Sequence, residues 1–176
     1  NLGRLNLTIR ADVSVKRILF DEDGEQPRAT GVEAVSGDET FVVGAGEIVL
    51  SAGAIGSPQI LMLSGVGPEA HLDEHGIPVV LNSPGVGQNL RDHPIFQIAW
   101  KTKPEVPLEA FGPRAQLTLR YTAPGSDVEN DMIVYCVAVA SERPDRGGLR
   151  SEPYGMSTTL ALNLAKGKGE LRLNSA

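Results

Sequence analysis

The fold is decided by residues 47–67, which read EIVLSAGAIGSPQILMLSGVG. The aliphatic run 48–50 has the composition of a short, fully buried strand. Small residues follow it, and Ser57 with Pro58 has the pattern of an N-cap and a first helical position. Gly65 lies where a glycine commonly ends a helix. The stretch therefore predicts a buried strand, a tight turn with room for a ligand, and a helix that begins at Ser57. The apolar surface of this helix is expected to come from Ile60, Leu61, Leu63 and Ser64.

The residues before this stretch predict short strands joined by polar turns. Residues 5–9 alternate apolar and polar side chains, as a half-buried strand does. Residues 13–20, 29–35 and 40–43 are further extended segments, and Gly37 lies in the turn between the last two. We expect these segments to form an accessory sheet of α/β to α+β type.

The residues after the stretch predict a second, short helix and then a loop. Pro68 begins this helix, Gly76 ends it, and residues 71–75 match the zinc-peptidase pattern H-x-x-E-H. Because the helix has only about two turns, we interpret His71 and His75 as a solvated helix face and predict no metal site. A short strand is expected over 77–81. The Gly-, Asn- and Pro-rich residues 82–94 then form a loop that is either plain surface or close to a ligand.

The second half of the chain predicts a mainly antiparallel sheet. Residues 95–100, 132–139 and 156–164 have strand patterns, whereas 115–121 fits a strand or a helix. We expect one face of this sheet to be buried. Lys166 and Lys168 are interpreted as part of a charged hairpin turn rather than as a phosphate site.

Composition excludes several classes of partner. The net charge is −6 and only 5% of residues are aromatic, so a nucleic-acid-binding surface is not expected. No apolar run is long enough for a transmembrane helix, and the single cysteine, Cys136, cannot form an internal disulfide.

The chain shows no signal-peptide pattern, which suggests a cytoplasmic location. It also lacks an initiator methionine and begins within an expected strand, so we expect an internal piece of a longer protein.

The central stretch closely resembles the second signature of the glucose–methanol–choline (GMC) family of FAD oxidoreductases. That signature combines small residues, a Ser-Pro pair, paired aliphatics and a Ser-Gly-aliphatic-Gly ending. Further segments resemble the family in the same order, notably 6–9, 30–33, 76–79, 84–93 and 169–173, and the choline-dehydrogenase-like branch is the most similar. The signature positions are filled here by Gly53, Ala54, Ser57, Pro58, Ile60, Leu61, Ser64, Gly65, Val66 and Gly67.

The resemblance implies two domains and an FAD cofactor. Residues 1–92 resemble the middle of the FAD-binding domain, 93–165 resemble part of the substrate domain with its antiparallel sheet, and 166–176 resemble the return towards the FAD domain. The resemblance also implies contacts to FAD. Val15 is expected at the adenine end, Ser51, Ala52 and Gly53 near the ADP moiety, and Asn89 and His93 near the flavin.

The resemblance implies no catalytic residue within this chain. The family's first Gly-x-Gly-x-x-Gly and its C-terminal histidine, which handles the substrate hydroxyl proton, have no counterpart here. The full-length protein is therefore expected to oxidise a small-molecule alcohol, such as a choline-like compound, by hydride transfer to FAD, and the piece alone is expected to be inactive. The alternative is a non-catalytic α+β binding or structural module derived from the same family. The substrate, the electron acceptor and the oligomeric state do not follow from the sequence.

Overall fold

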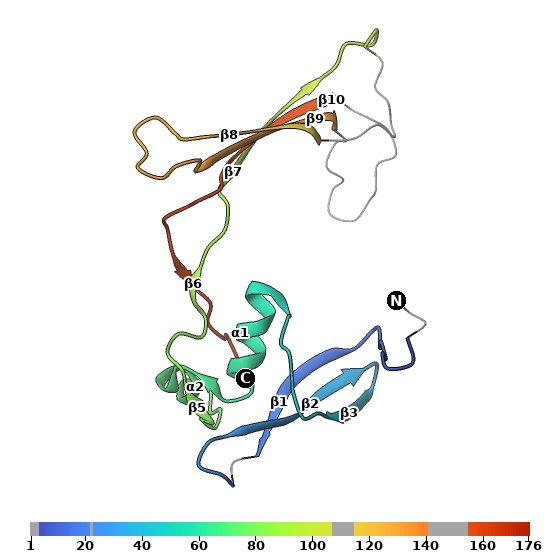
Figure 1. Ribbon diagram of the computed structural model, residues 1–176, viewed down its shortest axis with the longest axis vertical. Helices are drawn as coiled ribbons and strands as arrows, with labels where there is room; N and C mark the ends of the chain where they lie inside the picture. Colours follow the sequence, from blue (N-terminus) through green and yellow to red (C-terminus); the bar gives the residue numbers. More distant parts are fainter. Residues whose placement is uncertain (1–3, 22, 107–114, 141–154) are drawn as a thin grey trace. The chain divides into compact units, whose positions relative to one another are not determined.

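The computed structural model describes residues 4–21, 23–106, 115–140 and 155–176, which form two compact units (Figure 1). Residues 1–90 and 168–176 make up the first unit, and residues 91–167 make up the second. In the described ranges, no helix is long and apolar enough to cross a membrane. The first unit contains β1 (Ser14–Asp21), β2 (Arg28–Ser36), β3 (Glu39–Gly44), α1 (Gly53–Leu63), β4 (Val66–Gly67), α2 (Glu69–Glu74), β5 (Leu81–Asn82), β6 (Gln88–Leu90) and β11 (Gly169–Glu170). The second contains β7 (Ile95–Lys101), β8 (Ala115–Tyr121), β9 (Met132–Ala140) and β10 (Gly155–Leu162).

The first sheet is an antiparallel meander in the order β1-β2-β3. Its second hairpin pairs Ser36 with Glu39, and Gly37 takes a positive φ of 57° in the two-residue turn between them. These three predicted strands and this turn are confirmed. The strand predicted over 5–9 is wrong, because residues 5–6 form a turn, residues 7–9 pair with no strand of the described chain, and Leu5 is fully exposed. Alternation alone does not create a strand where no neighbour supplies hydrogen bonds.

The central stretch differs from the prediction at its start. Residues 48–50 pair with no strand of the described chain, and Val49 is 80% exposed, so the predicted buried strand is wrong. The helix α1 begins at Gly53 rather than at Ser57, and Pro58 lies inside it. The early start of α1 has a local cause. The Ser57 hydroxyl accepts a hydrogen bond from the backbone N–H of Ala52 at 3.0 Å, and this bond closes a turn before Ser57.

The end of α1 and the following helix agree with the sequence. Ser64 is the C-cap of α1, and Gly65 follows it with a φ of 81°. The helix α2 lies between Pro68 and His75, and Gly76 follows with a φ of 66°. The strand predicted over 77–81 is reduced to β5, which pairs in parallel with β4.

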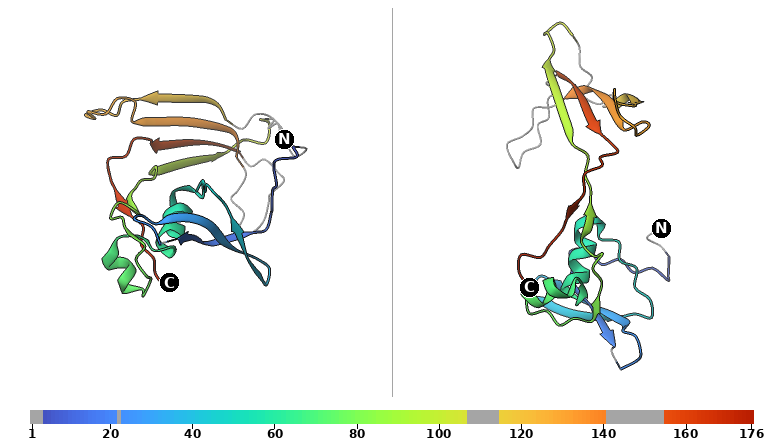
Figure 2. Two further views of the ribbon diagram at one scale, coloured as in Figure 1. Left: turned by 60° about the horizontal axis from the view of Figure 1, so that its bottom comes forward. Right: turned by 90° about the vertical axis from the view of Figure 1, so that its left-hand side faces the viewer.

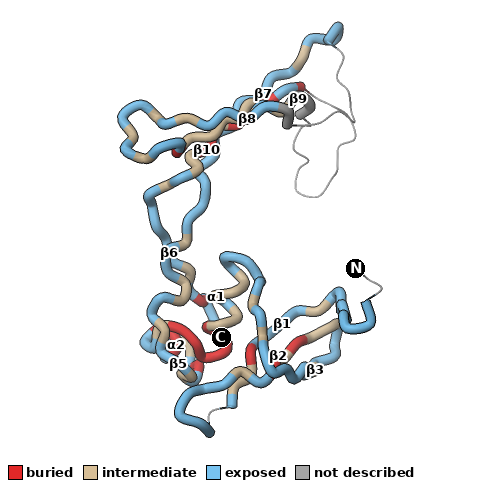
Figure 3. Tube along the Cα trace, in the orientation of Figure 1, coloured by how far each residue is buried: buried red, intermediate tan, exposed pale blue. Residues whose placement is uncertain are grey.

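A small core holds the first unit together, and its buried residues gather at α2 and the end of α1 (Figure 3). Met62 is fully buried, although the sequence pattern left it outside the expected apolar face. The last residues of the chain enter the same core through Leu173. The cluster consists of Met62, Leu72, Ile77 and Leu173, with Leu63, Val79, Val86 and Leu171 packed against it.

The segment after residue 166 does not form the predicted hairpin. Its strand β11 pairs with β6, where Gly169 lies opposite Leu90, and not with β10. The backbone N–H of Leu171 also donates to the Gly87 carbonyl at 2.7 Å. Packing the side chains of Leu171 and Leu173 into the core of the first unit stabilises this segment more than a tight turn next to β10 would, because apolar burial outweighs turn propensity.

The second unit is one antiparallel sheet in the order β7-β10-β9-β8, with the strands side by side (Figure 2). The predicted antiparallel sheet is confirmed, and the ambiguous segment 115–121 is a strand. One face of the inner strand β10 is buried, as expected, at Ser157, Thr159 and Ala161, but the large apolar side chains lie on the other face. Phe96 and Trp100 of β7 are 65% and 50% exposed, and Cys136 of β9 is exposed.

The Asp131 carboxylate closes the connection between β8 and β9. The carboxylate accepts a hydrogen bond from the backbone N–H of Ala123 at 2.8 Å, and Asp131 is only 4% exposed. Hydrogen bonding from the Ser126 hydroxyl and from the Ala123 amide lowers the pKa of the Asp131 carboxyl.

We therefore expect the sheet of the second unit to lose stability in acid. A lowered pKa in the folded state stabilises the fold above the carboxyl's ordinary value near 3.8, and this contribution disappears as the pH falls through the lower folded-state pKa. Urea unfolding of the wild type and of Asp131→Asn between pH 6 and pH 2.5 checks this. The acid-induced loss should be smaller in the variant, and equal slopes would exclude this role of Asp131.

Candidate functional site

The small residues 51–53 form an open turn at the start of α1. Ser51, Ala52 and Gly53 are all exposed, and a Cβ added to Gly53 would have no neighbour within 4 Å. Gly53 has a φ of 83°, so its backbone adopts a conformation that other residues rarely tolerate. The first N–H groups of a helix have no partner within that helix. The Ser57 hydroxyl already binds the Ala52 N–H, so what the turn offers is an open approach at Gly53 to the N–H groups at the start of α1.

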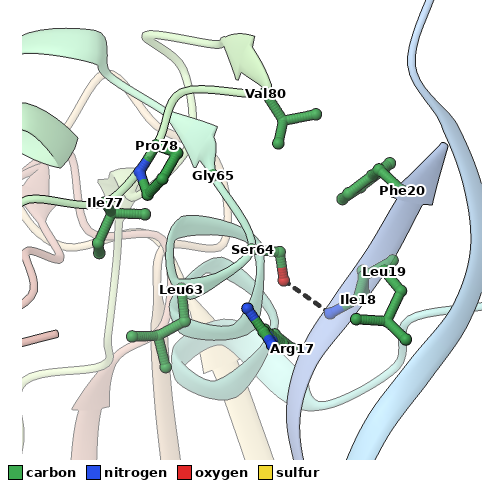
Figure 4. A pocket seen from close by; sticks show the side chains of 10 residues that line it. All are labelled: Arg17, Ile18, Leu19, Phe20, Leu63, Ser64, Gly65, Ile77, Pro78 and Val80. Carbon is green, nitrogen blue, oxygen red and sulfur yellow. Dashed lines mark hydrogen bonds between the residues drawn. The ribbon is translucent and has the colours of Figure 1, made fainter. Parts of the chain in front are cut away.

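Ser64 connects this helix to the strand that carries Val15. Its hydroxyl accepts a hydrogen bond from the backbone N–H of Ile18 at 2.8 Å (Figure 4). The same hydroxyl donates to the Ile60 carbonyl at 2.5 Å. Val15 lies on the same strand, β1, opposite Ala34, and is 37% exposed. Ser64 thus holds together the two elements that carry Val15 and residues 51–53. Ser64 was identified from the sequence as part of the family signature, but its hydrogen bond to Ile18 was not predicted.

Replacing Ser64 by alanine is expected to destabilise the protein by about 2 kcal/mol, because the Ile18 N–H would lose its buried acceptor. The exposed Ser14 on the same strand is the matched control, and Ser14→Ala should change the stability by less than about 0.5 kcal/mol. Equilibrium unfolding in urea measures both variants. Equal losses would show that the Ser64–Ile18 bond is not the cause.

A groove of about 280 Å³ lies beside this bond (Figure 4). One wall is β1 with Ile18 and Phe20, and the other contains Pro78 and Val80. Ser64 and Gly65 lie between the walls. The lining is mainly apolar, and its one charged side chain, Arg17, is paired with Glu33 at 2.9 Å. The groove therefore suits packing more than the recognition of a charged group.

The remaining predicted cofactor residues lie in different units. Asn89 is exposed on β6 of the first unit, with a φ of 62°. His93 belongs to the second unit, where its backbone N–H donates to the Asp92 carboxylate at 2.7 Å. It lines a groove of about 450 Å³ together with Arg91, Asn163 and Lys166, and Lys166 is paired with Asp127. Val15, residues 51–53 and Asn89 thus share the first unit, and His93 does not.

His71 and His75 are engaged with the C-terminal segment and do not form a solvated face, so this interpretation is wrong. His71 is 6% exposed, and its Nε2 accepts a hydrogen bond from the Leu173 N–H at 2.9 Å. The Nε2 of His75 lies 3.1 Å from the Leu173 carbonyl and donates to it. Both histidines therefore anchor the backbone of Leu173.

These hydrogen bonds also assign the proton on His71. Because its Nε2 is an acceptor, its Nδ1 carries the proton and donates to the Glu74 carboxylate at 3.3 Å. Arg172 donates to the same carboxylate at 2.8 Å. The hydrogen bond from His71 and then the charge of Arg172 lower the pKa of Glu74.

His71, Glu74 and His75 also have potential metal-ligating atoms within 4.8 Å of one another. A metal ion would have to displace both the Nδ1 proton of His71 and the guanidinium of Arg172, which supplies positive charge there. The arrangement is explained more simply as an anchor for the C-terminal segment.

The comparisons with known proteins point to one family. Residues 1–95 match the sequence profile described as GMC oxidoreductase. Choline oxidase of Arthrobacter globiformis is 35% identical over 173 residues, which are 97% of this chain and 31% of that protein. The chain thus spans about a third of the length of this relative.

Two solved structures are also similar. An FAD-dependent oxidoreductase from Chaetomium thermophilum is 43% identical with a TM-score of 0.51, over 56% of this chain and 17% of that chain. Formate oxidase of Aspergillus oryzae RIB40 has a TM-score of 0.79 at 23% identity, over 98% of this chain and 38% of that chain. The second likeness concerns the fold alone, and it extends across both units.

Proposed function

The chain belongs to the GMC oxidoreductase family, and we propose on this premise that it contributes the cofactor-holding region of an FAD-dependent oxidoreductase that oxidises the CH–OH group of a small alcohol. The match over residues 1–95 carries this proposal, because it contains the open turn 51–53 and the strand of Val15. The similarity to choline oxidase supports the part of the proposal that names an alcohol as the substrate.

The residues of the first unit fit an extended cofactor such as FAD. The turn 51–53 presents backbone N–H groups at a helix start, where anionic groups are favourably bound, and Gly53 leaves its approach open. In this proposal Val15, Ser51, Ala52 and Gly53 hold the adenosine end, and Asn89 and His93 approach the flavin. FAD supplies the acceptor for the hydride that leaves the alcohol carbon.

The described histidines of the first unit are not free to act as the catalytic base. His71 and His75 each bind the backbone of Leu173, and His71 is buried. A base must reach the substrate hydroxyl directly or through one water. We therefore propose that neither of them removes the substrate proton.

The proposal is tested by purifying the intact protein and recording its flavin absorbance, then adding choline and uncharged alcohols without oxygen. Flavin that is bleached by an alcohol supports the proposal. A protein that binds no FAD and oxidises no alcohol would favour the non-catalytic module instead.

A matched pair of glycines tests the cofactor contact. Gly53 and Gly37 both have positive φ and open space around an added Cβ, so valine causes similar backbone strain at either position. Only Gly53→Val is expected to lower the flavin content, because only Gly53 lies in the proposed contact. Equal flavin content in the two variants would contradict the role of Gly53.

A further inference from the structure

The backbone of Leu173 is bound by two histidines from one short helix of the first unit. Its N–H donates to Nε2 of His71 at 2.9 Å, and its carbonyl accepts a hydrogen bond from Nε2 of His75 at 3.1 Å. His71 lies on α2, and His75 is the C-cap of that helix. The two rings meet edge to face, with their centroids 4.9 Å apart. We call His71, His75 and the backbone of Leu173 the histidine anchor.

The two hydrogen bonds of the anchor respond differently to a second proton on the ring. Nε2 of His71 accepts a hydrogen bond, so a proton on this nitrogen would point at the Leu173 N–H, and the bond would be lost. Nε2 of His75 is a donor, and a second proton on this ring goes to Nδ1 and leaves the bond to the Leu173 carbonyl in place. Of the two histidines, only His71 therefore has to stay neutral for the anchor to hold.

The charges around His71 do not remove this conflict. In the described chain, the titratable groups in contact with its ring are Glu74, His75 and Arg172. Glu74 binds the proton on Nδ1, and the Arg172 guanidinium, which lies 4.0 Å from the Glu170 carboxylate, brings positive charge to 3.1 Å from the same nitrogen. Glu74 and Arg172 thus both meet the Nδ1 side of the ring, and neither offers an acceptor to a proton on Nε2.

The lost bond would lie in a buried place. His71 is 6% exposed and Leu173 is 9% exposed, and the Leu173 side chain packs in the cluster of Met62 and Leu72. A buried N–H that loses its acceptor costs the free energy of its desolvation, because little water can replace the partner. The Leu173 N–H regains a partner when its segment moves away from α2 into water.

We propose that the histidine anchor is sensitive to acid: it holds the segment around Leu173 against α2 at neutral pH and releases it when His71 takes up a second proton. This inference goes beyond the proposed function and does not depend on it. An imidazole in water takes up its second proton near pH ~6.5. Because only the released segment is compatible with a proton on Nε2, the anchor is intact above this pH and weakens as the pH falls below it. Between pH 7.5 and pH 5.5 the released population should rise about tenfold.

Amide hydrogen exchange of the intact protein at pH 7.5 and pH 5.5 tests this inference. The rates are expressed as protection factors, so that the pH dependence of the intrinsic exchange is removed. The protection factor of the Leu173 amide should fall about tenfold on acidification, whereas those of the amides in β2 should stay unchanged. Equal protection of Leu173 at both pH values would overturn the inference. An equal loss of protection in β2 would overturn it too, because acid would then act on the whole unit.

His71→Gln and His75→Gln give a matched pair of variants. Glutamine does not titrate, and its amide can accept a hydrogen bond through oxygen or donate one through nitrogen, as each position requires. His71→Gln should abolish the pH dependence at Leu173, and His75→Gln should keep the wild-type tenfold change. A pH dependence that survives in His71→Gln, or that is lost in His75→Gln, would contradict the role of His71. Should His71→Gln not fold, the wild type and His75→Gln still decide the matter. None of these measurements depends on flavin or on alcohol oxidation, so the proposed function is tested separately.

Discussion

Replacing Gly65 by alanine is expected to destabilise the protein by about 3 kcal/mol. Gly65 has a φ of 81°, and an added Cβ would lie 2.4 Å from the Pro78 carbonyl oxygen and 2.8 Å from Cγ2 of Val80. The left-handed conformation costs a non-glycine residue roughly 1–2 kcal/mol. Forcing an extra methyl into a packed site adds roughly 1–3 kcal/mol.

Gly53 separates these two contributions. Its φ of 83° is nearly the same, but an added Cβ would meet nothing within 4 Å. Gly53→Ala should therefore cost only the conformational part, about 1 kcal/mol. Unfolding in urea measures both variants, and equal losses would show that the contact with Pro78 is relieved by a small shift of the backbone.

This comparison explains why one sequence signature contains glycines of two kinds. The carbonyl of Gly65 accepts hydrogen bonds from Val80 at 2.8 Å and Leu81 at 3.1 Å, so the chain must pass very close to it. Gly53 lies in an open turn where closeness to the rest of the chain is not the reason for a glycine. The end of the signature therefore serves the fold, and its beginning is available to a ligand.

The sequence predicts the elements that local patterns control. The meander of β1, β2 and β3 and the helix end at Gly65 follow from alternation, turn residues and a positive φ. Residues 48–50 have an equally good strand pattern, yet they have no strand partner in the described chain. A strand forms only when a neighbouring strand hydrogen-bonds to it, so the residues of one segment cannot by themselves determine that it is a strand.

Long-range contacts explain what the sequence did not show at the candidate sites. His71 and His75 have a spacing that places them on one helix face, but their partner, Leu173, lies at the far end of the chain. Ser64 contacts Ile18 in the same way, across two elements. The residues predicted to contact FAD, Val15, Ser51, Ala52, Gly53, Asn89 and His93, came from the family resemblance, and their contacts with FAD stay predictions.

Met62→Ala is the second substitution with a large expected effect, a loss of about 3 kcal/mol. Met62 is fully buried and belongs to the cluster with Leu72, Ile77 and Leu173. Truncating a buried methionine removes apolar contacts and leaves a cavity, which typically costs roughly 2–5 kcal/mol. Met62→Leu keeps most of the volume and should cost less than about 1.5 kcal/mol.

Ile55 is the control on the same helix, because it is 62% exposed and its truncation should change stability by less than about 0.5 kcal/mol. The position of Met62 also predicts where the loss appears. Leu171 and Leu173 are held by hydrogen bonds to Gly87 and His71, and their side chains pack in or against the Met62 cluster. In Met62→Ala, hydrogen exchange should therefore accelerate at these two amides before it accelerates in β2. Uniform acceleration across the first unit would show instead that the core opens as a whole, and that the C-terminal segment has no separate stability for Met62 to support.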